Sequence, residues 1–396
     1  MPAGNWSFAT TIHLPSMGFG TYGLQLDPGT VLTYTGKADA IAAPAYGLFA
    51  ASLLIEGGQL IGTPAAAAGI HTFPTNQIVI RNMVIRDFTG GDGIRIEGAN
   101  TVDILQDVVV DNRVGIHLIG THCLQRRDSR NDLICDMNLQ GAGYAPNAIH
   151  VIGNMITQNT QWGIWEDFAP RVTAALNNLY LGNNLESNGD RKDHGAMWLA
   201  YSRATQVEAN YFEGPAPYIR IGAADWPPSV GVAVRGNYFT TNAAVPVTLD
   251  LVNAEDTMIE DNSQYDAFPS ATPCFVNLGK EKGTYLGKNH LESTSIACRG
   301  GKPAQLPASA WEANPGPPMS APGSIGRFVG QLTTSANPTD ALKAADLTPA
   351  GHCAAFAADA KGSTLTGVYA EAGNGSVTVH HAGQAGGKLN VFCSLE

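Results

Sequence analysis

The chain has 396 residues, including 45 glycines and 23 prolines, and only 14% of its residues are charged. The formal net charge of −11 leaves no basic face for nucleic acid and no polybasic membrane anchor. No run of 18 apolar residues occurs, so no membrane insertion is expected, and residues 1–6 lack the basic start and apolar core of a signal peptide. This composition is typical of a turn-rich, all-β protein.

From residue 8 onward the chain shows short alternating apolar segments separated by turns. Gly69, Gly93 and Gly115 each open such a segment, at steps of 24 and 22 residues. Residues 124–146 interrupt the pattern and read as inserted loops. Gly163 follows Gly115 by 48 residues, which we interpret as two turns of a repeat.

An asparagine then returns at a nearly fixed interval. The steps are 26, 27, 25 and 27 residues, and the asparagines are Asn184, Asn210, Asn237, Asn262 and Asn289. The segments between them are strand-length, and none shows a helical pattern. A period near 25 residues with short strands predicts a parallel β-helix, a solenoid of stacked coils. We expect each asparagine to occupy a left-handed bend and to bond its amide to the next coil.

The composition changes beyond the repeat. Residues 301–323 are rich in proline, glycine and serine and are predicted to form an extended linker. Strand-like segments return after it. We therefore predict a β-helix over residues 1–300, the linker, and a small C-terminal β-domain over residues 324–396.

The cysteines form no Cys-x-x-Cys pair, so the sequence predicts neither a metal site nor a cofactor. They are too sparse for a disulfide-stapled scaffold. We expect mostly reduced, buried thiols, with Cys353 and Cys393 the one pair to check. The six are Cys123, Cys135, Cys274, Cys298, Cys353 and Cys393.

The asparagine repeat, the linker and the tail together resemble phage tailspike proteins, especially the tail segments 366–369 and 376–379 between Cys353 and Cys393. The resemblance implies a right-handed parallel β-helix, a homotrimer, and a virion tail protein that acts outside the cell on bacterial surface polysaccharide. It also implies a glycan-binding and catalytic face on residues 1–300, and a role in trimerisation or carbohydrate binding for residues 324–396. Tailspikes usually carry an N-terminal particle-binding domain, whereas here the repeat begins almost at residue 1. A shortened chain, an isolated depolymerase and a bacterial relative all stay open.

Strand alternation predicts which side chains face the solvent. The isoleucines Ile94, Ile116, Ile164 and Ile219 are placed inside the solenoid. The outward positions are then predicted to be Arg95, Glu97, His117, Trp165, Asp167, Met197 and Arg220. An outward column of this kind is suited to sugar binding, with Trp165 as a stacking platform. The predicted substrate-binding residues are Trp165, Arg95, His117, His194, Arg220 and Glu97.

Glycoside hydrolysis usually needs two carboxyl groups about 5–10 Å apart. Coils of about 4.8 Å would put Glu97 and Asp167, taken as three turns apart, at about 14 Å, too far to form a pair. We therefore predict Glu166, Asp167 and Asp193 as the catalytic group. Glu166 is expected to face inward, where partial burial raises its pKa toward that of a general acid.

Other sites and reactions stay open. Glu97, Asp225 or a groove between subunits could hold the chemistry instead. A polysaccharide lyase acting by β-elimination on a uronate could draw on His117, His194, Tyr201, Arg95 or Arg220. A non-catalytic receptor-binding spike or adhesin is the third possibility.

Overall fold

The structure, a computed structural model, describes most of the chain. The described residues are 1–14, 21–43, 52–73, 76–120, 124–127, 133–136, 145–167, 174–190, 193–214, 218–241, 247–266, 274–291, 295–299, 302–303, 327–343, 353–357, 365, 368–383 and 385–393. No membrane-crossing helix is found among them.

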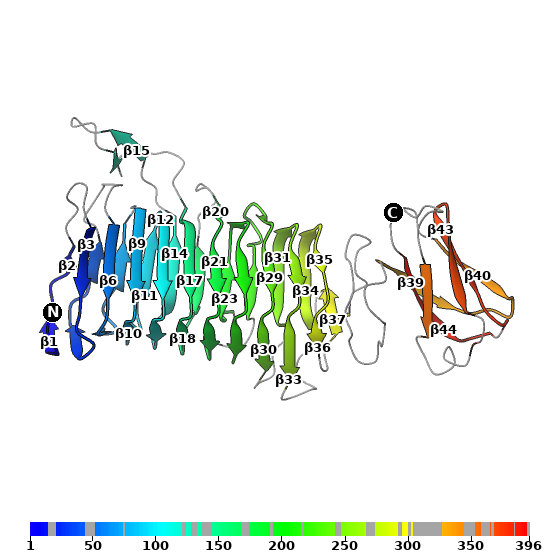
Figure 1. Ribbon diagram of the computed structural model, residues 1–396, viewed down its shortest axis with the longest axis horizontal. Coiled ribbons are helices and arrows are strands. Elements are labelled where there is room, and N and C mark those ends of the chain that lie inside the picture. Colours follow the sequence, from blue (N-terminus) through cyan, green and yellow to red (C-terminus); the bar gives the residue numbers. More distant parts are fainter. Residues whose placement is uncertain are drawn as a thin grey trace.

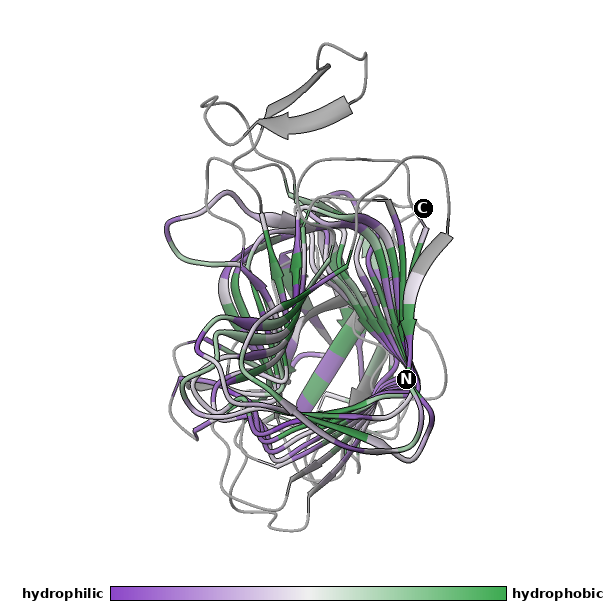
Figure 2. Cartoon of the chain, turned by 90° about the vertical axis from the view of Figure 1, so that its left-hand side faces the viewer, coloured by the Kyte–Doolittle hydropathy of each residue, from purple (hydrophilic) through white to green (hydrophobic). Residues whose placement is uncertain are grey.

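The N-terminal part is a right-handed parallel β-helix, as the sequence predicted (Figure 1). Each coil contributes one strand to an 11-stranded sheet and further strands to a 25-stranded assembly. Strand pairing orders that assembly into two columns, which we call the site sheet and the flank sheet, and they are joined where Ser229 and Val230 pair with Ala254 and Glu255. Viewed from the N-terminal side, the coils overlie one another around a shared interior (Figure 2).

The 11-stranded sheet contains β1 (Gly4–Phe8), β4 (Thr30–Tyr34), β7 (Gln59–Ile61), β10 (Val84–Arg86), β13 (Val108–Val110), β18 (Met155–Thr157), β22 (Asn184–Glu186), β26 (Tyr211–Glu213), β30 (Tyr238–Thr241), β33 (Ser263–Asp266) and β36 (His290–Leu291). The site sheet contains β2 (Ile12–His13), β5 (Asp39–Ala43), β8 (Ala68–Thr72), β11 (Asp92–Glu97), β14 (Val114–Ile119), β19 (Ile164–Asp167), β23 (Met197–Leu199), β27 (Ile219–Ile221), β31 (Leu249–Glu255), β34 (Cys274–Lys282) and β37 (Ser295–Arg299). The flank sheet contains β3 (Thr21–Gln25), β6 (Ser52–Glu56), β9 (Asn76–Arg81), β12 (Asn100–Leu105), β17 (Asn147–Ile152), β20 (Ala175–Leu176), β21 (Leu179–Leu181), β24 (Ser202–Arg203), β25 (Gln206–Glu208), β28 (Ser229–Val230), β29 (Ala233–Arg235), β32 (Met258–Glu260) and β35 (Tyr285–Leu286).

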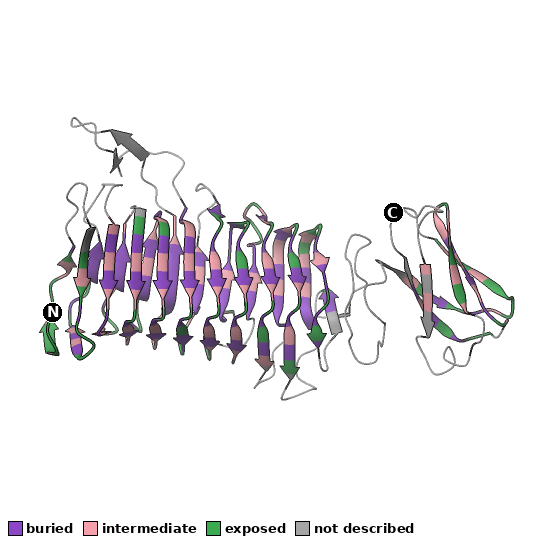
Figure 3. Cartoon of the chain, in the orientation of Figure 1, coloured by how far each residue is buried: buried purple, intermediate pink, exposed green. Residues whose placement is uncertain are grey.

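The interior is filled by stacked aliphatic side chains. Ile94 pairs with Ile116, and Ile116 with Ile164, and both of these strand pairs are parallel and in register. All four isoleucines predicted to lie inside, Ile219 included, have no exposed surface. Buried positions recur from strand to strand along the solenoid (Figure 3). Burying one such side chain contributes about 1.5–3 kcal/mol, so the stack supplies much of the stability. The predicted strand register is confirmed at these positions.

Buried asparagines form a ladder along the solenoid, as predicted, but one member is different. The Asn210 amide donates to Tyr180 O (2.9 Å) and to Asn237 Oδ1 (3.0 Å). The ladder continues on the N-terminal side through Asn183 (2.9 Å), not through Asn184, which lies half-buried in β22. The prediction of a left-handed backbone at the asparagines is also wrong. The residue just before the asparagine has the positive φ instead, as at Gly182 (63°), Ala209 (51°) and Gly236 (61°).

The insertion after β14 occupies part of one coil rather than adding a second coil. β14 pairs directly with β19, with Ile116 opposite Ile164. The intervening residues include the antiparallel hairpin of β15 (Leu124–Arg127) and β16 (Leu133–Asp136), which stands off the solenoid in Figure 1. The interpretation of the 48-residue step as two turns is therefore wrong. A hairpin of this kind adds residues without adding a rung.

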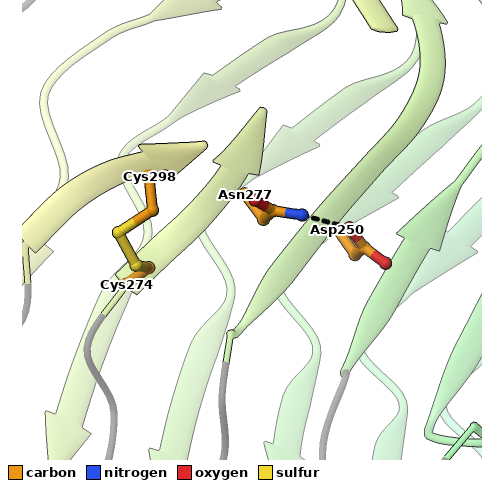
Figure 4. The surroundings of a disulfide bond; sticks show 4 residues. All are labelled: Asp250, Cys274, Asn277 and Cys298. Carbon is orange, nitrogen blue, oxygen red and sulfur yellow. Dashed lines mark hydrogen bonds between the residues drawn. A yellow bond between two sulfur atoms is a disulfide. The ribbon is translucent and has the colours of Figure 1, made fainter. Parts of the chain in front are cut away.

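The expectation of reduced thiols is also wrong. Cys274 and Cys298 form a disulfide between β34 and β37, the last coils of the site sheet (Figure 4). Cys353 is disulfide-bonded as well, and Cys393 lies opposite it in the β41–β44 pairing. No free cysteine occurs in the described part of the chain. The short strand β38 (Lys302–Pro303) closes against β37.

The described residues beyond 326 form two three-stranded antiparallel sheets. One sheet orders β39 (Arg327–Thr333), β44 (Lys388–Cys393) and β41 (Cys353–Ala357), and the other orders β40 (Thr339–Lys343), β43 (Ser376–His380) and β42 (Tyr369–Gly373). Their small core consists of Leu332, Val377, Val379, Leu389 and Val391. A small C-terminal β-unit is thus present, as predicted.

Candidate active site

One outward column of side chains runs along the site sheet, and we call it the central column. Strand pairing places in it, in coil order, His71, Arg95, His117, Trp165, Trp198, Arg220 and Asp250. Met197, predicted in this column, instead pairs with Ile164 and has no exposed surface. The prediction is wrong because Ala196, not Gly195, lies level with Gly163. That shift of one residue exchanges the inward and outward positions.

The middle of the central column is an aromatic stack. The rings of His117 and Trp165 are 4.6 Å apart and nearly parallel, and Trp165 and Trp198 follow at 5.3 Å. The guanidinium of Arg220 lies 6.0 Å from the Trp198 ring and 5.4 Å from the buried ring of Trp162. Such half-buried rings are suited to bind the apolar face of a sugar.

A buried aspartate anchors the column at its N-terminal side. Asp92, the first residue of β11, is fully buried and accepts hydrogen bonds from Arg95 (2.7 Å) and His117 Nδ1 (2.8 Å). It also forms an ion pair with Arg113 (2.5 Å). Burial by itself would raise the pKa of Asp92. The hydrogen bond from His117 and the charges of His117, Arg95 and Arg113 outweigh burial and lower that pKa to about 2.

His117 links Asp92 to a carboxylate at the surface. Its Nε2 atom lies 3.7 Å from Asp167 Oδ2, and the Asp167 side chain is 35% exposed. Burial would lower the pKa of His117, but the two flanking carboxylates raise it above its ordinary value. We call Asp92, His117 and Asp167 the second relay, because an equivalent set lies nearer the N-terminus.

The first relay consists of Asp39, His71 and Glu97. His71 Nδ1 lies 2.8 Å from Asp39 Oδ2, and His71 Nε2 lies 3.2 Å from Glu97 Oε2. Burial opposes protonation of this histidine too, while its bonds to the two carboxylates raise its pKa. The side chain of Glu97 is 13% exposed.

The two relays share one geometry and are displaced by two rungs. In each relay an aspartate is the first residue of a strand. The histidine lies in the next coil, three positions further along the strand direction. The second carboxylate lies one coil further still, two positions beyond the histidine. Pairing of Glu97 with Ile119, and of Ile119 with Asp167, puts the two carboxylates two rungs apart. That is about 10 Å between Cα atoms, not the predicted 14 Å. The earlier exclusion of this pair is therefore wrong.

Glu166 lies inside the solenoid, on the other side of β19. It has no exposed surface and accepts hydrogen bonds from Asn178 (2.8 Å), Tyr180 (2.5 Å) and Ser202. Burial raises its pKa to about 7, while the bonds from Tyr180 and Asn178 act in the opposite direction. The direction matches the sequence-based expectation. A carboxyl group in the core does not contact a glycan at the surface, so the structure separates Glu166 from Asp167.

Asp193 and His194 lie in the turn before β23, whereas Asp167 ends β19. No hydrogen bond or ion pair joins Asp193 to Asp167 in the described part of the chain. The Asp193 carbonyl accepts from Arg220 (3.0 Å), and His194 pairs with Asp190 (2.9 Å) and meets Trp162 edge-on. The predicted trio of Glu166, Asp167 and Asp193 is thus not brought together, although Asp193 and His194 do border the central column.

Several residues of this site were missing from the sequence-based set: Asp39, His71, Asp92 and Trp198. The available signal was that Asp39 and Asp92 are each the first residue of a strand and occupy the same register position, three positions before that of Arg95. This signal can be recognised only when the alignment of the coils is known, because each relay takes its residues from three successive coils. Tyr201, a candidate for the lyase base, is largely buried.

Residues 54–244, a little under half of the chain, match the family model described as "Periplasmic copper-binding protein (NosD)". The described residues do not fit a metal site, because no group of three or more histidine, cysteine, aspartate or glutamate side chains among them could hold an ion. The column histidines are instead each engaged by carboxylates.

No curated protein has a sequence that matches this chain. Among solved structures, the surface adhesin PfbA of Streptococcus pneumoniae is similar, with 11% identity, a TM-score of 0.53, and coverage of 75% of this chain and 80% of that one. The Azotobacter vinelandii mannuronan C-5 epimerase AlgE4 A-module has 11% identity, a TM-score of 0.48, and coverage of 78% and 89%. A Geobacillus virus E2 protein has 11% identity, a TM-score of 0.48, and coverage of 99% and 67%. At such identity the likeness to PfbA shows the fold alone.

Proposed function

We propose that this protein is a polysaccharide depolymerase that hydrolyses glycosidic bonds at the site sheet, with Glu97 and Asp167 as the catalytic pair. The observation that carries this is the repetition of the relay, which presents one carboxylate from each copy at the same level of the sheet. Because both side chains leave the same face of the sheet at the same level, their carboxyl groups are taken to lie about as far apart as their Cα atoms, about 10 Å. A separation of that order leaves space for a water molecule between the carboxylates. It therefore fits hydrolysis by direct displacement, with inversion at the anomeric carbon.

The reaction needs one proton donor and one proton acceptor. Glu97 would protonate the glycosidic oxygen as the carbon–oxygen bond breaks, and Asp167 would take the proton of the water whose oxygen bonds to the anomeric carbon. The greater exposure of Asp167, 35% against 13% for Glu97, assigns it to the water. His71 and His117 each hold one carboxylate in place from behind.

The substrate we propose is a bacterial surface polysaccharide, bound over Trp165 and Trp198. A tailspike role, with a homotrimer on a virion tail acting outside the cell, is part of the same proposal. It is supported by the solenoid followed by a small β-unit, and by the Cys274–Cys298 disulfide, since disulfides persist mainly in oxidising surroundings.

The test is the release of reducing ends from purified capsule or O-antigen. Hydrolysis is expected to release reducing ends without a rise in the absorbance of an unsaturated uronate. β-Elimination, the second candidate, would raise that absorbance. His117 and Arg95, which lie opposite each other in neighbouring strands, would supply its base and its cation. Binding without cleavage would leave a receptor-binding spike or adhesin and contradict the enzyme proposal.

A further inference from the structure

A hollow of about 380 Å³ opens on the site sheet just past the aromatic stack. Its lining contains Trp198, Arg220, Gly222, Ala223, Ala224, Asp225, Trp226, Asp250 and Val252. We propose that this hollow is a subsite that selects an uncharged sugar ring of the polysaccharide. The proposal rests on the proposed function and adds to it the chemical class of one substrate unit.

The wall of the hollow is held in a fixed conformation. Gly222 has a φ of +83°, and a Cβ atom there would meet Asn253 O at 2.0 Å, so only glycine fits this turn. The Trp226 amide donates to Ala223 O (3.3 Å), and the Asn253 side chain donates to Trp226 O (2.7 Å). Trp226 is half-buried and packs on the main core. The loop is therefore ordered before any ligand binds.

The floor is fixed in the same way. The indole nitrogen of Trp198 donates to Gly222 O (3.0 Å), which sets the tilt of the ring. Two indole rings from different coils, Trp198 and Trp226, thus line one hollow of sugar size. Aromatic rings bind the C–H faces of pyranose rings by burial and dispersion, and neither term depends on charge.

The charges of the lining decide against an anionic sugar. Arg220 is the one cation in the lining, and it pairs with Asp250 (3.3 Å) and donates to Asp193 O (3.0 Å). The other oxygen of Asp250 accepts from Asn277 (2.9 Å; Figure 4). Asp225 adds an exposed carboxylate with no ion pair among the described residues.

With one cation against two carboxylates, the lining offers no free positive charge to a uronate. Lys280 lies outside the lining and reaches only the Ala224 carbonyl (3.5 Å). Bringing a sugar carboxylate next to Asp225 would cost electrostatic free energy, whereas sugar hydroxyls can donate to Asp225 and accept from Arg220. The hollow therefore fits a neutral ring.

The position of the hollow sets the direction of the bound glycan. β23, β27 and β31 follow β19 in successive coils, so Arg220 lies two rungs, or about 10 Å, beyond the level of Asp167. A chain that reaches from Glu97 into the hollow runs along the solenoid axis. The neutral ring then lies a fixed number of units from the bond that is cut.

The test uses an array of purified capsules and O-antigens, sorted into glycans with neutral sugars in the repeat and glycans built only of uronates. Intact protein is compared with Trp226→Ala, with Ala224→Trp, which fills the hollow from an exposed position, and with Trp6→Ala, a control in β1. We expect binding to glycans that contain neutral sugars, weakened roughly tenfold or more by Trp226→Ala and Ala224→Trp and unchanged by Trp6→Ala. Thermal melts show whether Trp226→Ala is folded. If it is not, the binding of Ala224→Trp alone tests the subsite.

Binding confined to all-uronate glycans, or unaltered binding by Ala224→Trp, overturns the subsite. If cleavage depends on Glu97 and Asp167 while both hollow variants bind normally, the proposed function stands and the subsite fails. If the intact protein cuts no glycan but Trp226→Ala and Ala224→Trp still weaken binding, the subsite is supported and the proposed hydrolase function is rejected. An intact protein that binds no glycan on the array overturns both.

Discussion

Each surface carboxylate of the proposed site is paired with a histidine whose other nitrogen is held by an aspartate. A carboxylate exposed on a flat β-face would sample several rotamers. His71 and His117 are largely buried and locked between two acidic groups, so they give Glu97 and Asp167 a preferred position. Precise placement of this kind contributes more to catalysis than the mere presence of the groups.

The first prediction concerns this pair. Glu97→Gln and Asp167→Asn are each expected to lower kcat by orders of magnitude and leave glycan affinity nearly unchanged, because proton transfer is made only in the transition state. Initial rates of reducing-end release and equilibrium binding measure the two effects. Asp193→Asn is the matched control and should retain activity. Loss of cleavage with Asp193→Asn alone would return the site to the turn before β23.

The second prediction concerns the buried charge of Asp92. Its folded-state pKa, about 2, lies below the ordinary 3.8, so its contribution to stability is present above about pH 4 and is lost as the pH falls through 2. Asp92→Asn leaves Arg95 and Arg113 without their counter-ion and should cost about 3–5 kcal/mol at neutral pH. Urea unfolding measured from pH 5 to pH 2 should show that the difference in the free energy of unfolding between wild type and Asp92→Asn becomes smaller as the pH falls. A difference that does not change with pH would contradict the low pKa of Asp92.

The third prediction concerns the aromatic stack. Trp165→Ala is expected to weaken glycan binding by roughly 1–3 kcal/mol while kcat at saturation changes little, because stacking acts on the bound ground state and the transition state alike. Titration calorimetry and saturation kinetics separate the two effects. A variant with normal affinity and a collapsed kcat would place Trp165 in the chemistry instead.

At the scale of the element, one coil is stable only through its neighbours. A strand of three residues such as β22 or β26 is too short to persist alone. The buried asparagine just before each strand, Asn183 or Asn210, needs partners in the coils above and below. Each asparagine amide bonds the backbone of one coil and the side chain of the next. The ladder therefore links neighbouring coils from Asn154 to Asn289 and fixes their register.

The fourth prediction compares two adjacent asparagines. Asn183→Ala removes a buried ladder amide and leaves its partners unsatisfied, which should lower the free energy of unfolding by about 1–3 kcal/mol. Asn184→Ala, which removes only a partly exposed bond to Glu186, should cost less than about 0.5 kcal/mol. Chemical denaturation measures both. Equal costs would mean that the ladder adds no more than an ordinary surface hydrogen bond.

The sequence predicted the coil better than it predicted the stacking of coils. Period and alternation are local, so the solenoid and the inward isoleucines followed from the pattern. A single displaced residue at Gly195 was enough to exchange Met197 and Trp198. The residues of the β15–β16 hairpin were counted as an extra rung, and that error placed Asp167 one rung too far from Glu97. The relays could not be predicted because each depends on the alignment of three coils. That alignment depends on how many of the inserted residues belong to the coil, which no local sequence pattern gives.

At the scale of the whole molecule, a solenoid has two ends where strand edges lack partners. At the C-terminal end the Cys274–Cys298 disulfide joins neighbouring strands across a separation of 24 residues. A loop of that size corresponds to about 3–4 kcal/mol in the chain-entropy description. The cross-link therefore stabilises the last coils against fraying, but it does not cover their edge.

The last prediction concerns the C-terminal part, which we propose holds three chains together. Two three-stranded sheets with a core of five buried side chains are a small unit, and Tyr369 is 52% exposed on it. We propose that Val368, Tyr369, Val379, Val391 and Phe392 belong to a trimerisation module. Val379 and Val391 lie in its core, and association would bury exposed apolar surface such as that of Tyr369. Deleting residues 324–396 should yield a monomer or an aggregate by light scattering, while the full chain gives a trimer. Replacing Tyr369 by serine, a single change outside the small core, should weaken the trimer without unfolding the solenoid. A shortened chain that is still a stable trimer would place the contact between solenoids and remove this role from the C-terminal unit.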